Sequence, residues 1–328
     1  MFATRVLLPP PYPVGQVGNH WNPSKPEPTM YQSLINKSLL ALAVAAALAP
    51  AAHAQSQSWG TTTGVGSVSY ESQYVFRGKK ITNSAVQPKG EIILTPNGSS
   101  NFDVYVGAWM NQPVSRRGAP PAPDQSDEVD VWAGLEYALP SDSNTYKFTL
   151  DLGDTYYWYP DAGGSSLPTP TGSHASFSDE VNIGLTWNMP PIANNTTLVP
   201  KVFYYHDFIL ASDTVEVSLS TKIDLKDMLG FNGFTITPTI RGGWTTATKA
   251  FGDQLPAGTA NWHNGYKYWQ AGLELDYALS EDCYLFGNVD YAGNDDGKTG
   301  APVIIGGNPQ WGGTPNSVWF GAGLRFQK

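Results

Sequence analysis

The segment from Ser317 to Lys328 has an apolar side chain at every second position, and the positions between them are small or polar except for Trp319. Its apolar positions are Val318, Phe320, Ala322, Leu324 and Phe326. Successive side chains of a strand point to opposite faces, so this period predicts a β-strand with one continuous apolar face. Such a strand also needs a partner for its edge, because unpaired backbone groups in lipid cost several kcal/mol each. The segment therefore predicts a closed ring in which the last strand pairs with the first.

The same alternation recurs along the chain in segments of about ten residues, the length that a tilted membrane strand requires. A soluble sandwich would show the same alternation but would bury its apolar faces in protein. With the last strand the segments number about twelve, and bacterial single-chain barrels have even numbers. The other expected strands are Gly64 to Phe76, Val86 to Thr95, Phe102 to Met110, Glu128 to Leu139, Tyr146 to Leu152, Glu180 to Trp187, Leu198 to Tyr205, Thr214 to Ser220, Phe234 to Ile240, Lys267 to Tyr277 and Cys283 to Tyr291.

The connections between these segments alternate between short and long. Outer-membrane barrels have short periplasmic turns and longer extracellular loops, so both chain ends are expected on the periplasmic side. The predicted fold class is all-β, a single closed antiparallel transmembrane β-barrel. Short connections are expected near Pro96 to Ser100, Pro140 to Thr145, Met189 to Thr197, Asp224 to Gly233 and Leu279 to Asp282, and longer ones near Asn111 to Asp127, Pro160 to Ser176, Thr246 to Gly265 and Ala292 to Asn316.

Composition agrees with a barrel and excludes other classes. The mean hydropathy of -0.27 excludes a bundle of apolar spanning helices, whereas Gly 34 and Pro 26 supply many turns. The single cysteine, Cys283, excludes an intrachain disulfide, and no cofactor or metal site is expected. Asn294 begins a calcium-like run, but its twelfth position is Ile305 rather than Glu, so the EF-hand pattern fails.

The start of the chain is expected to be removed in the mature protein. Residues 1–29 are rich in proline and read as an over-extended gene model before Met30. Residues 30–54 resemble a secretory signal peptide, with Lys37, a short apolar run and small residues before the cleavage site. Cleavage is expected between Ala54 and Gln55, so that residues 55–328 form the barrel. These carry 16 basic and 27 acidic residues, which argues against nucleic acid as a partner.

Two motifs carry a resemblance to known outer-membrane proteins. The run from Ser72 to Gly78 resembles the Ser-x-Tyr-x-Phe-Arg-Gly signature of a largely uncharacterised proteobacterial outer-membrane family. The spacing of Gly321, Leu324 and Phe326 resembles the C-terminal signal by which Gram-negative barrels are recognised for assembly. The resemblance implies an outer-membrane location and contact with the barrel assembly machinery, lipid and lipopolysaccharide. On the strand pattern we expect Tyr74 and Phe76 to face lipid, Arg77 to turn inward and Gly78 to begin a loop.

The polar faces of the strands should line the lumen, and there acidic groups outnumber basic ones about two to one. The leading interpretation is a narrow passive pore for small polar or cationic solutes in a monomeric or weakly oligomeric barrel. The alternative is a non-conducting structural or surface-receptor barrel in which opposite charges pair across the lumen. The expected lumen residues are Glu71, Arg77, Glu91, Asp103, Asp130, Glu136, Asp151, Glu180, Glu216, Arg241, Glu274, Asp276, Asp290 and Arg325.

No enzymatic activity is expected. A remote alternative is an outer-membrane lipid hydrolase using His206, Asp207 and Ser212, but catalysis needs an oriented base in contact with its nucleophile, which proximity in sequence does not establish. One residue conflicts with the alternation. Asp154 falls on the lipid face of its strand unless a bulge near Gly153 shifts the pattern.

Overall fold

The computed structural model describes residues 60–82, 84–99, 101–114, 127–139, 147–160, 167–168, 174–175, 177–191, 196–226, 230–246, 265–295, 304–305, 308–309 and 316–328. The expected signal peptide and its cleavage site at Ala54 and Gln55 lie outside these residues. Among the described residues, no helix is long and apolar enough to cross a membrane.

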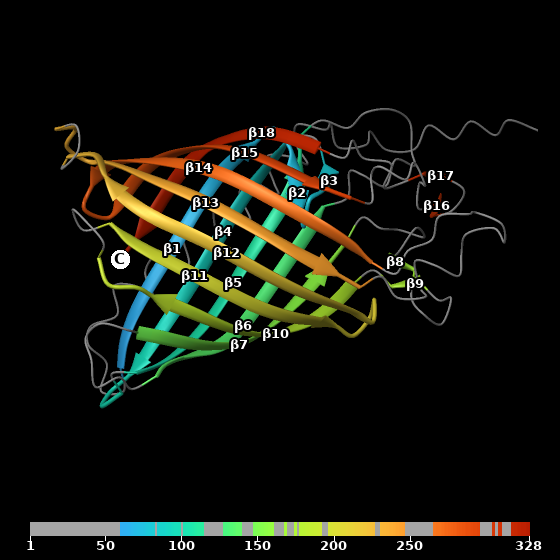
Figure 1. Ribbon diagram of the computed structural model, residues 1–328, viewed down its shortest axis with the longest axis horizontal. Helices are drawn as coiled ribbons and strands as arrows, with labels where there is room; N and C mark the ends of the chain where they lie inside the picture. Colours follow the sequence, from blue (N-terminus) through green and yellow to red (C-terminus); the bar gives the residue numbers. More distant parts are fainter. Residues whose placement is uncertain are drawn as a thin grey trace, which may run out of the picture.

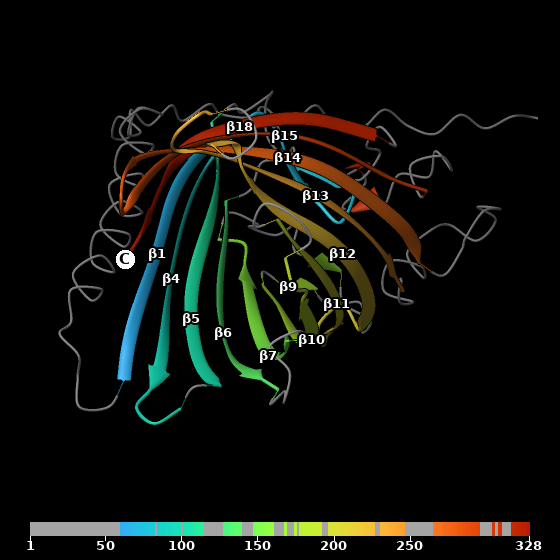
Figure 2. The ribbon, with the colours of Figure 1, turned by 60° about the vertical axis from the view of Figure 1, so that its left-hand side comes forward.

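Twelve strands form one closed antiparallel barrel in which sequence neighbours pair with one another (Figures 1 and 2). Three small two-stranded sheets are not part of this ring of strands: β2 (Tyr74–Phe76) with β3 (Lys79–Thr82), β8 (Leu167–Pro168) with β9 (His174–Ala175), and β16 (Ile304–Ile305) with β17 (Asn308–Pro309). The barrel strands are β1 (Gly60–Glu71), β4 (Ala85–Pro96), β5 (Phe102–Pro113), β6 (Glu128–Ala138), β7 (Lys147–Trp158), β10 (Phe177–Asn188), β11 (Thr197–Asp207), β12 (Ser212–Asp224), β13 (Phe234–Thr245), β14 (Tyr266–Ser280), β15 (Cys283–Asn294) and β18 (Asn316–Gln327).

The last strand closes the ring by pairing with the first, as the sequence predicts. β18 lies between β15 and β1, and its register with β1 runs from Val65 opposite Gln327 to Glu71 opposite Gly321. Closure leaves no edge strand, so the backbone donors and acceptors of every barrel strand have a neighbouring strand on each side.

The predicted first strand, Gly64 to Phe76, is wrong at its end. β1 stops at Glu71, and Ser72 makes the last contacts with β18 through its backbone N–H and its hydroxyl. The chain then leaves the wall and forms the separate hairpin of β2 and β3. Alternation cannot reveal this break, because a hairpin inside the barrel continues the same period of two.

The outward face of the wall carries a band of exposed apolar side chains. Leu135 and Leu152 are directly paired across β6 and β7, and both are exposed. This band is what lipid requires, so the barrel spans a bilayer and is an outer-membrane protein. Other members of the band are Val106, Val131, Ile183, Val202, Val217, Ile240, Leu273, Val289 and Phe320.

Asp154 lies on this outward face, as the alternation predicts, because no bulge at Gly153 shifts the register. The register of β6 and β7 runs unbroken through Gly134 opposite Gly153 and Ala133 opposite Asp154. Asp179 of β10 also occupies an outward position, diagonal to Asp154. The apolar band is therefore interrupted by carboxylates on β7 and β10.

Candidate functional site in the barrel lumen

The register places the strand residues of the expected lumen set on the inward face. Asp103 pairs with Glu136, and Glu136 with Asp151, while the intervening Leu135 and Leu152 face outward. Continuing around the ring, Arg241 pairs with Gln270. Arg77, the remaining member, lies in the turn of the β2–β3 hairpin and points to Glu180 on the wall.

Three carboxylates stand side by side on the inner wall. Asp103 of β5, Glu136 of β6 and Asp151 of β7 are direct cross-strand neighbours, and we call them the acidic row. Like charges directly opposite one another destabilise a sheet unless solvent or counter-ions screen them. The exposed amine of Lys201 lies on β11, two strands further round. The acidic row is therefore tolerated only where water, a cation such as the Lys201 amine, or protonation relieves the repulsion.

Most of the inward carboxylates that make hydrogen bonds are held by neutral donors rather than by cations. The Tyr105 hydroxyl donates to both oxygens of Asp151 at 3.2 and 3.1 Å, and the Asn182 amide donates to the same carboxylate at 2.5 Å. The Trp132 indole N–H donates to Glu91 at 2.8 Å, and the Tyr268 hydroxyl to Glu216 at 2.6 Å. These contacts hold the carboxylates in place through groups that carry no charge of their own.

Within the described part of the chain, the lumen holds two ion-paired arginines. Arg325 contacts Glu274 at 2.9 Å and Asp276 at 3.0 Å, and its guanidinium lies 4.8 Å from the centre of the Phe286 ring. Arg77 pairs with Glu180. Arg241 instead donates to the neutral Gln270, whose amide continues to Asp290 at 3.0 Å.

Large inward side chains lie along the wall because their direct cross-strand neighbour is glycine. A Cβ added at Gly107 would meet the Trp132 ring at 2.3 Å, and one added at Gly134 would meet the Tyr105 hydroxyl at 2.2 Å. Bulky inward side chains thus lie against the wall at positions where the neighbouring strand has glycine. The same pairing joins Gly184 with Phe203, Gly243 with Tyr268, Gly272 with Asp290, Gly321 with Glu71, and Gly323 with Phe286.

The β2–β3 hairpin, residues Tyr74–Thr82, lies inside the barrel, and we call it the inner hairpin. It lies at the end of the barrel that is farther from the C-terminus (Figure 1). Because the C-terminus is on the periplasmic side, we call this end the outer end. On one side, Val75 packs with Ala292 of β15 and Trp319 of β18, and Asn294 of β15 donates to the Gly78 carbonyl at 2.6 Å.

On the opposite side, the inner hairpin reaches β5 and β7. The Tyr74 ring lies 5.0 Å from that of Trp109, and the Phe76 ring 6.2 Å from that of Tyr157. The inner hairpin thus bridges opposite walls of the outer end. Many buried polar wall groups surround it there, among them Asn111, Glu128, Ser178, Glu180 and Asn294, whereas Lys147 and Lys201 toward the periplasmic end are exposed.

The turn of the inner hairpin has an unusual backbone. Arg77 and Gly78 both have positive φ, at 47° and 74°, as a two-residue type I′ turn requires. Glycine adopts this conformation freely, but for arginine it costs roughly 1–2 kcal/mol. Gly78 is further constrained, because an added Cβ would lie 2.5 Å from the Gly293 carbonyl oxygen. Contacts of the Arg77 side chain must therefore offset the strain.

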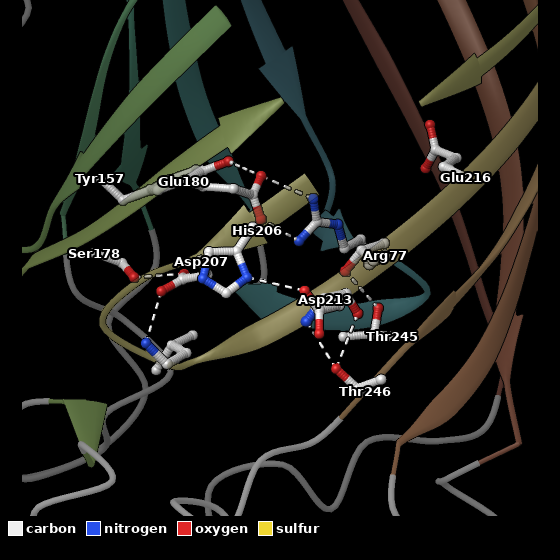
Figure 3. Close-up of polar contacts among 12 residues, drawn as sticks. Arg77, Tyr157, Ser178, Glu180, His206, Asp207, Asp213, Glu216, Thr245 and Thr246 are labelled. Carbon is white, nitrogen blue, oxygen red and sulfur yellow. Dashed lines mark hydrogen bonds and ion pairs between the residues drawn. The ribbon is translucent and has the colours of Figure 1, made fainter. Parts of the chain in front are cut away.

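Those contacts form a cage around the guanidinium. Arg77 donates to the two oxygens of Glu180 at 2.7 and 2.9 Å, and Tyr157 donates to the same carboxylate at 3.1 Å (Figure 3). The guanidinium carbon lies 4.7 Å from the ring centres of Phe76 and of Tyr205. Burial opposes the charge of Arg77, but attraction and hydrogen bonding from Glu180 outweigh it and raise the arginine pKa above its ordinary value. The arginine therefore stays protonated.

The expected lipid-facing positions of Tyr74 and Phe76 are wrong. Both rings lie inside the barrel against Trp109 and Tyr157. The expected inward turn of Arg77 and the start of a turn at Gly78 are what the structure has. Sequence reasoning missed the contacts from Trp109, Tyr157, Tyr205, Tyr268 and Asn294. The one local signal is Gly78, which interrupts the alternation and is the second residue of the two-residue turn. It predicts a hairpin turn only weakly, because the first turn residue is arginine rather than asparagine, aspartate or glycine.

The hydrolase alternative fails on geometry. His206 lies on the outward face, and its Nδ1 contacts Asp213 at 2.9 Å rather than Asp207 (Figure 3). Asp207 accepts from the Ser178 hydroxyl at 2.5 Å and from two backbone amides of the following turn. Ser212 is buried opposite Asp207 in the ladder. The three residues therefore do not form a nucleophile, base and orienting acid.

The residues of the expected assembly signal divide between the two faces of β18. Leu324 and Phe326 are exposed on the outward face, the latter at 51%. Gly321 faces inward, where an added Cβ would meet the Glu71 carboxylate.

Comparison with known proteins gives one family match. A family model described as "Bacterial protein of unknown function (Gcw_chp)" matches residues 53–281. No curated protein matches the sequence.

Among solved structures, several barrels share the general shape. LpxR from Salmonella typhimurium is 10% identical, with a TM-score of 0.41 over 80% of this chain and 99% of that one. The COG4313 outer membrane channel from Pseudomonas putida F1 is 8% identical, with a TM-score of 0.43 over 82% and 96%. The beta domain of the Bordetella autotransporter BrkA is 14% identical, with a TM-score of 0.40 over 82% and 99%. Likenesses this distant say nothing about the function of the chain.

Proposed function

The chain belongs to the Gcw_chp family of bacterial proteins of unknown function, and from its own geometry we propose that it forms a narrow passive pore in the outer membrane for small polar or cationic solutes. The observation that carries the proposal is the acidic row of Asp103, Glu136 and Asp151. Adjacent carboxylates repel one another on a wall, and water and cations that reach them relieve that repulsion. A dry, filled barrel would instead pair each acid with a base.

The neutral donors support the same conclusion. Phenol, indole and amide groups position Asp151, Glu91 and Glu216 without adding a positive charge. A lumen with an excess of fixed negative charge attracts cations, repels anions, and leaves neutral polar solutes unaffected. The glycines opposite Trp132 and Tyr105 allow those large side chains to lie against the wall.

The inner hairpin favours a second candidate, the non-conducting barrel. It bridges opposite walls at the outer end and buries Val75, Tyr268 and Trp319. A barrel closed in this way conducts only after the hairpin moves. A pore and a permanently closed barrel therefore differ in whether the outer end can open.

The test is conductance in planar bilayers of two purified, refolded proteins: the wild type, and a variant in which residues 73–83 are replaced by a short glycine and serine turn. Slower gel migration after heating verifies that each barrel is folded. We expect cation-selective channels, rarer in the wild type than in the variant. Anion-selective channels, or folded barrels that never conduct in either form, would contradict the proposed function.

A further inference from the structure

The wall residues around Arg77 are arranged as a receptor for a planar cation. Glu180 accepts both guanidinium donors, and Tyr157 donates to one of its oxygens, which fixes the carboxylate in place. Tyr205 offers its ring face at 4.7 Å. Bidentate hydrogen bonding and an aromatic face together match guanidinium better than ammonium, because guanidinium is planar and weakly hydrated. We call Tyr157, Glu180 and Tyr205 the guanidinium cage.

All three cage residues belong to the rigid barrel wall. They lie on the consecutive strands β7, β10 and β11, whose registers are unbroken around them. The group that fills the cage comes from elsewhere. Arg77 is the turn residue of a hairpin whose two strands are only three and four residues long and whose own register is irregular. The cage residues are therefore held by more backbone pairing than Arg77, which occupies the cage.

Withdrawal of the inner hairpin would leave Glu180 without its cation. This carboxylate is 4% exposed in the closed barrel and faces the lumen. A carboxylate in such surroundings must be compensated by another positive group or by protonation. In a lumen that already concentrates cations, a solute of the same shape as the arginine head is the fitting replacement.

From this geometry we infer that Tyr157, Glu180 and Tyr205 form a binding site for guanidinium-bearing solutes in the pore wall, which Arg77 occupies as an internal ligand while the inner hairpin closes the outer end. The inference rests on the proposed pore function, because a solute reaches the cage through the lumen. It adds a solute class and a reason why the barrel closes itself.

The test uses a substitution that removes the guanidinium from the cage and keeps the turn of the inner hairpin. Arg77→Asn removes the guanidinium, and asparagine followed by Gly78 is the sequence that a type I′ turn prefers. Methylguanidinium is titrated at millimolar concentration into the folded wild-type and variant barrels in detergent, and binding is followed by calorimetry. We expect saturable binding to the Arg77→Asn barrel, at least tenfold weaker binding to the wild type, and weaker binding of ammonium than of methylguanidinium.

The matched control is the double variant Arg77→Asn with Glu180→Gln, which keeps the shape of the cage but not its charge. We expect it to lose binding at least tenfold. Binding of equal strength in the wild type and in Arg77→Asn, or binding that survives Glu180→Gln, would overturn the site. If Arg77→Asn does not fold, Arg77→Gly takes its place, because glycine accepts the same positive φ.

Current measurements separate this inference from the proposed function. Methylguanidinium should block the current of the Arg77→Asn barrel at the concentrations at which it binds. Channels that conduct without any binding would refute the cage and leave the pore. Binding in folded barrels that never conduct, with or without the inner hairpin, would refute the pore and leave the cage.

Discussion

Neutralising Glu136 is the sharpest test of the acidic row. Glu136→Gln keeps the length and shape of a half-buried side chain that lies between Asp103 and Asp151. It removes one negative charge from the lumen and one member of a row of like charges. We therefore expect lower cation selectivity without loss of stability. Cross-strand side-chain pairs are worth about 0.2–1 kcal/mol, so removing one repulsion should raise the free energy of unfolding by about that amount.

The size of the selectivity change follows from Coulomb's law. A cation passing about 5 Å from the carboxylate in water gains about 0.8 kcal/mol, which raises the local cation concentration about fourfold and lowers that of anions equally. Screening over about 10 Å at 0.1 M salt reduces the energy to about 0.5 kcal/mol, so the cation-to-anion ratio should fall about fivefold in the variant. At 1 M salt, where the screening length is about 3 Å, the change should shrink to less than about twofold.

The assay is the reversal potential under a potassium chloride gradient, measured at both salt concentrations with the hairpin-deleted barrel and the same barrel carrying Glu136→Gln. Asp295→Asn is the control, because Asp295 lies just after the end of β15, at the rim of the barrel and away from the acidic row. Its carboxylate accepts a hydrogen bond from the backbone N–H of Lys267. An unchanged reversal potential at low salt, or an equal change for the control, would refute the reasoning that the acidic row faces the conducting path.

Four further outcomes are expected. Phe326→Asp should abolish accumulation in the outer membrane while Phe326→Leu does not, as cell fractionation would reveal; normal assembly of the aspartate variant would contradict the role of this outward side chain. The pairing of Arg77 raises its pKa, so its stabilising contribution is lost only above the ordinary arginine range; the excess of channel opening in Arg77→Asn over the wild type should therefore be the same at pH 7 and pH 10, and an excess that shrinks at pH 10 would count against the Arg77–Glu180 ion pair as the contact that holds the inner hairpin. Gly107→Val should displace the Trp132 ring, which an added Cβ meets at 2.3 Å, and lower the temperature at which the barrel unfolds on a gel; unchanged heat resistance would show that the ring has room to move. N-terminal sequencing of the mature protein should begin at Gln55, and a start within residues 1–29 would contradict the expected signal cleavage.

The wall of the barrel could be predicted from sequence because alternation has a direct physical cause. A strand between lipid and lumen must carry apolar groups on one face, so parity alone assigns Leu135 outward and Glu136 inward. The terminal strand with Phe326 likewise predicts its pairing with β1, since lipid tolerates no open edge. These are rules on single residues and their neighbours, and they need no knowledge of distant contacts.

The sequence also predicts the sign of the charge on the inward faces, but it does not predict which charged residues are neighbours. The sequence shows more acids than bases, yet only the register shows that Asp103, Glu136 and Asp151 are neighbours. Register depends on where each strand starts, which periodicity fixes only to within a few residues. That the carboxylates are held by tyrosine, tryptophan and asparagine rather than by lysine is likewise a matter of side chains from different strands meeting.

The position of the inner hairpin could not be predicted from the sequence. Its alternation continues that of β1, so Tyr74 and Phe76 looked like wall residues facing lipid, while in the fold they cross the lumen and meet Trp109 and Tyr157. The ion pair that holds the hairpin joins Arg77 to Glu180, residues 103 positions apart. Local pattern determined how this chain forms a wall, whereas only closure of the ring decided which side chains meet across it, because those contacts exist only when strands distant in sequence enclose one space.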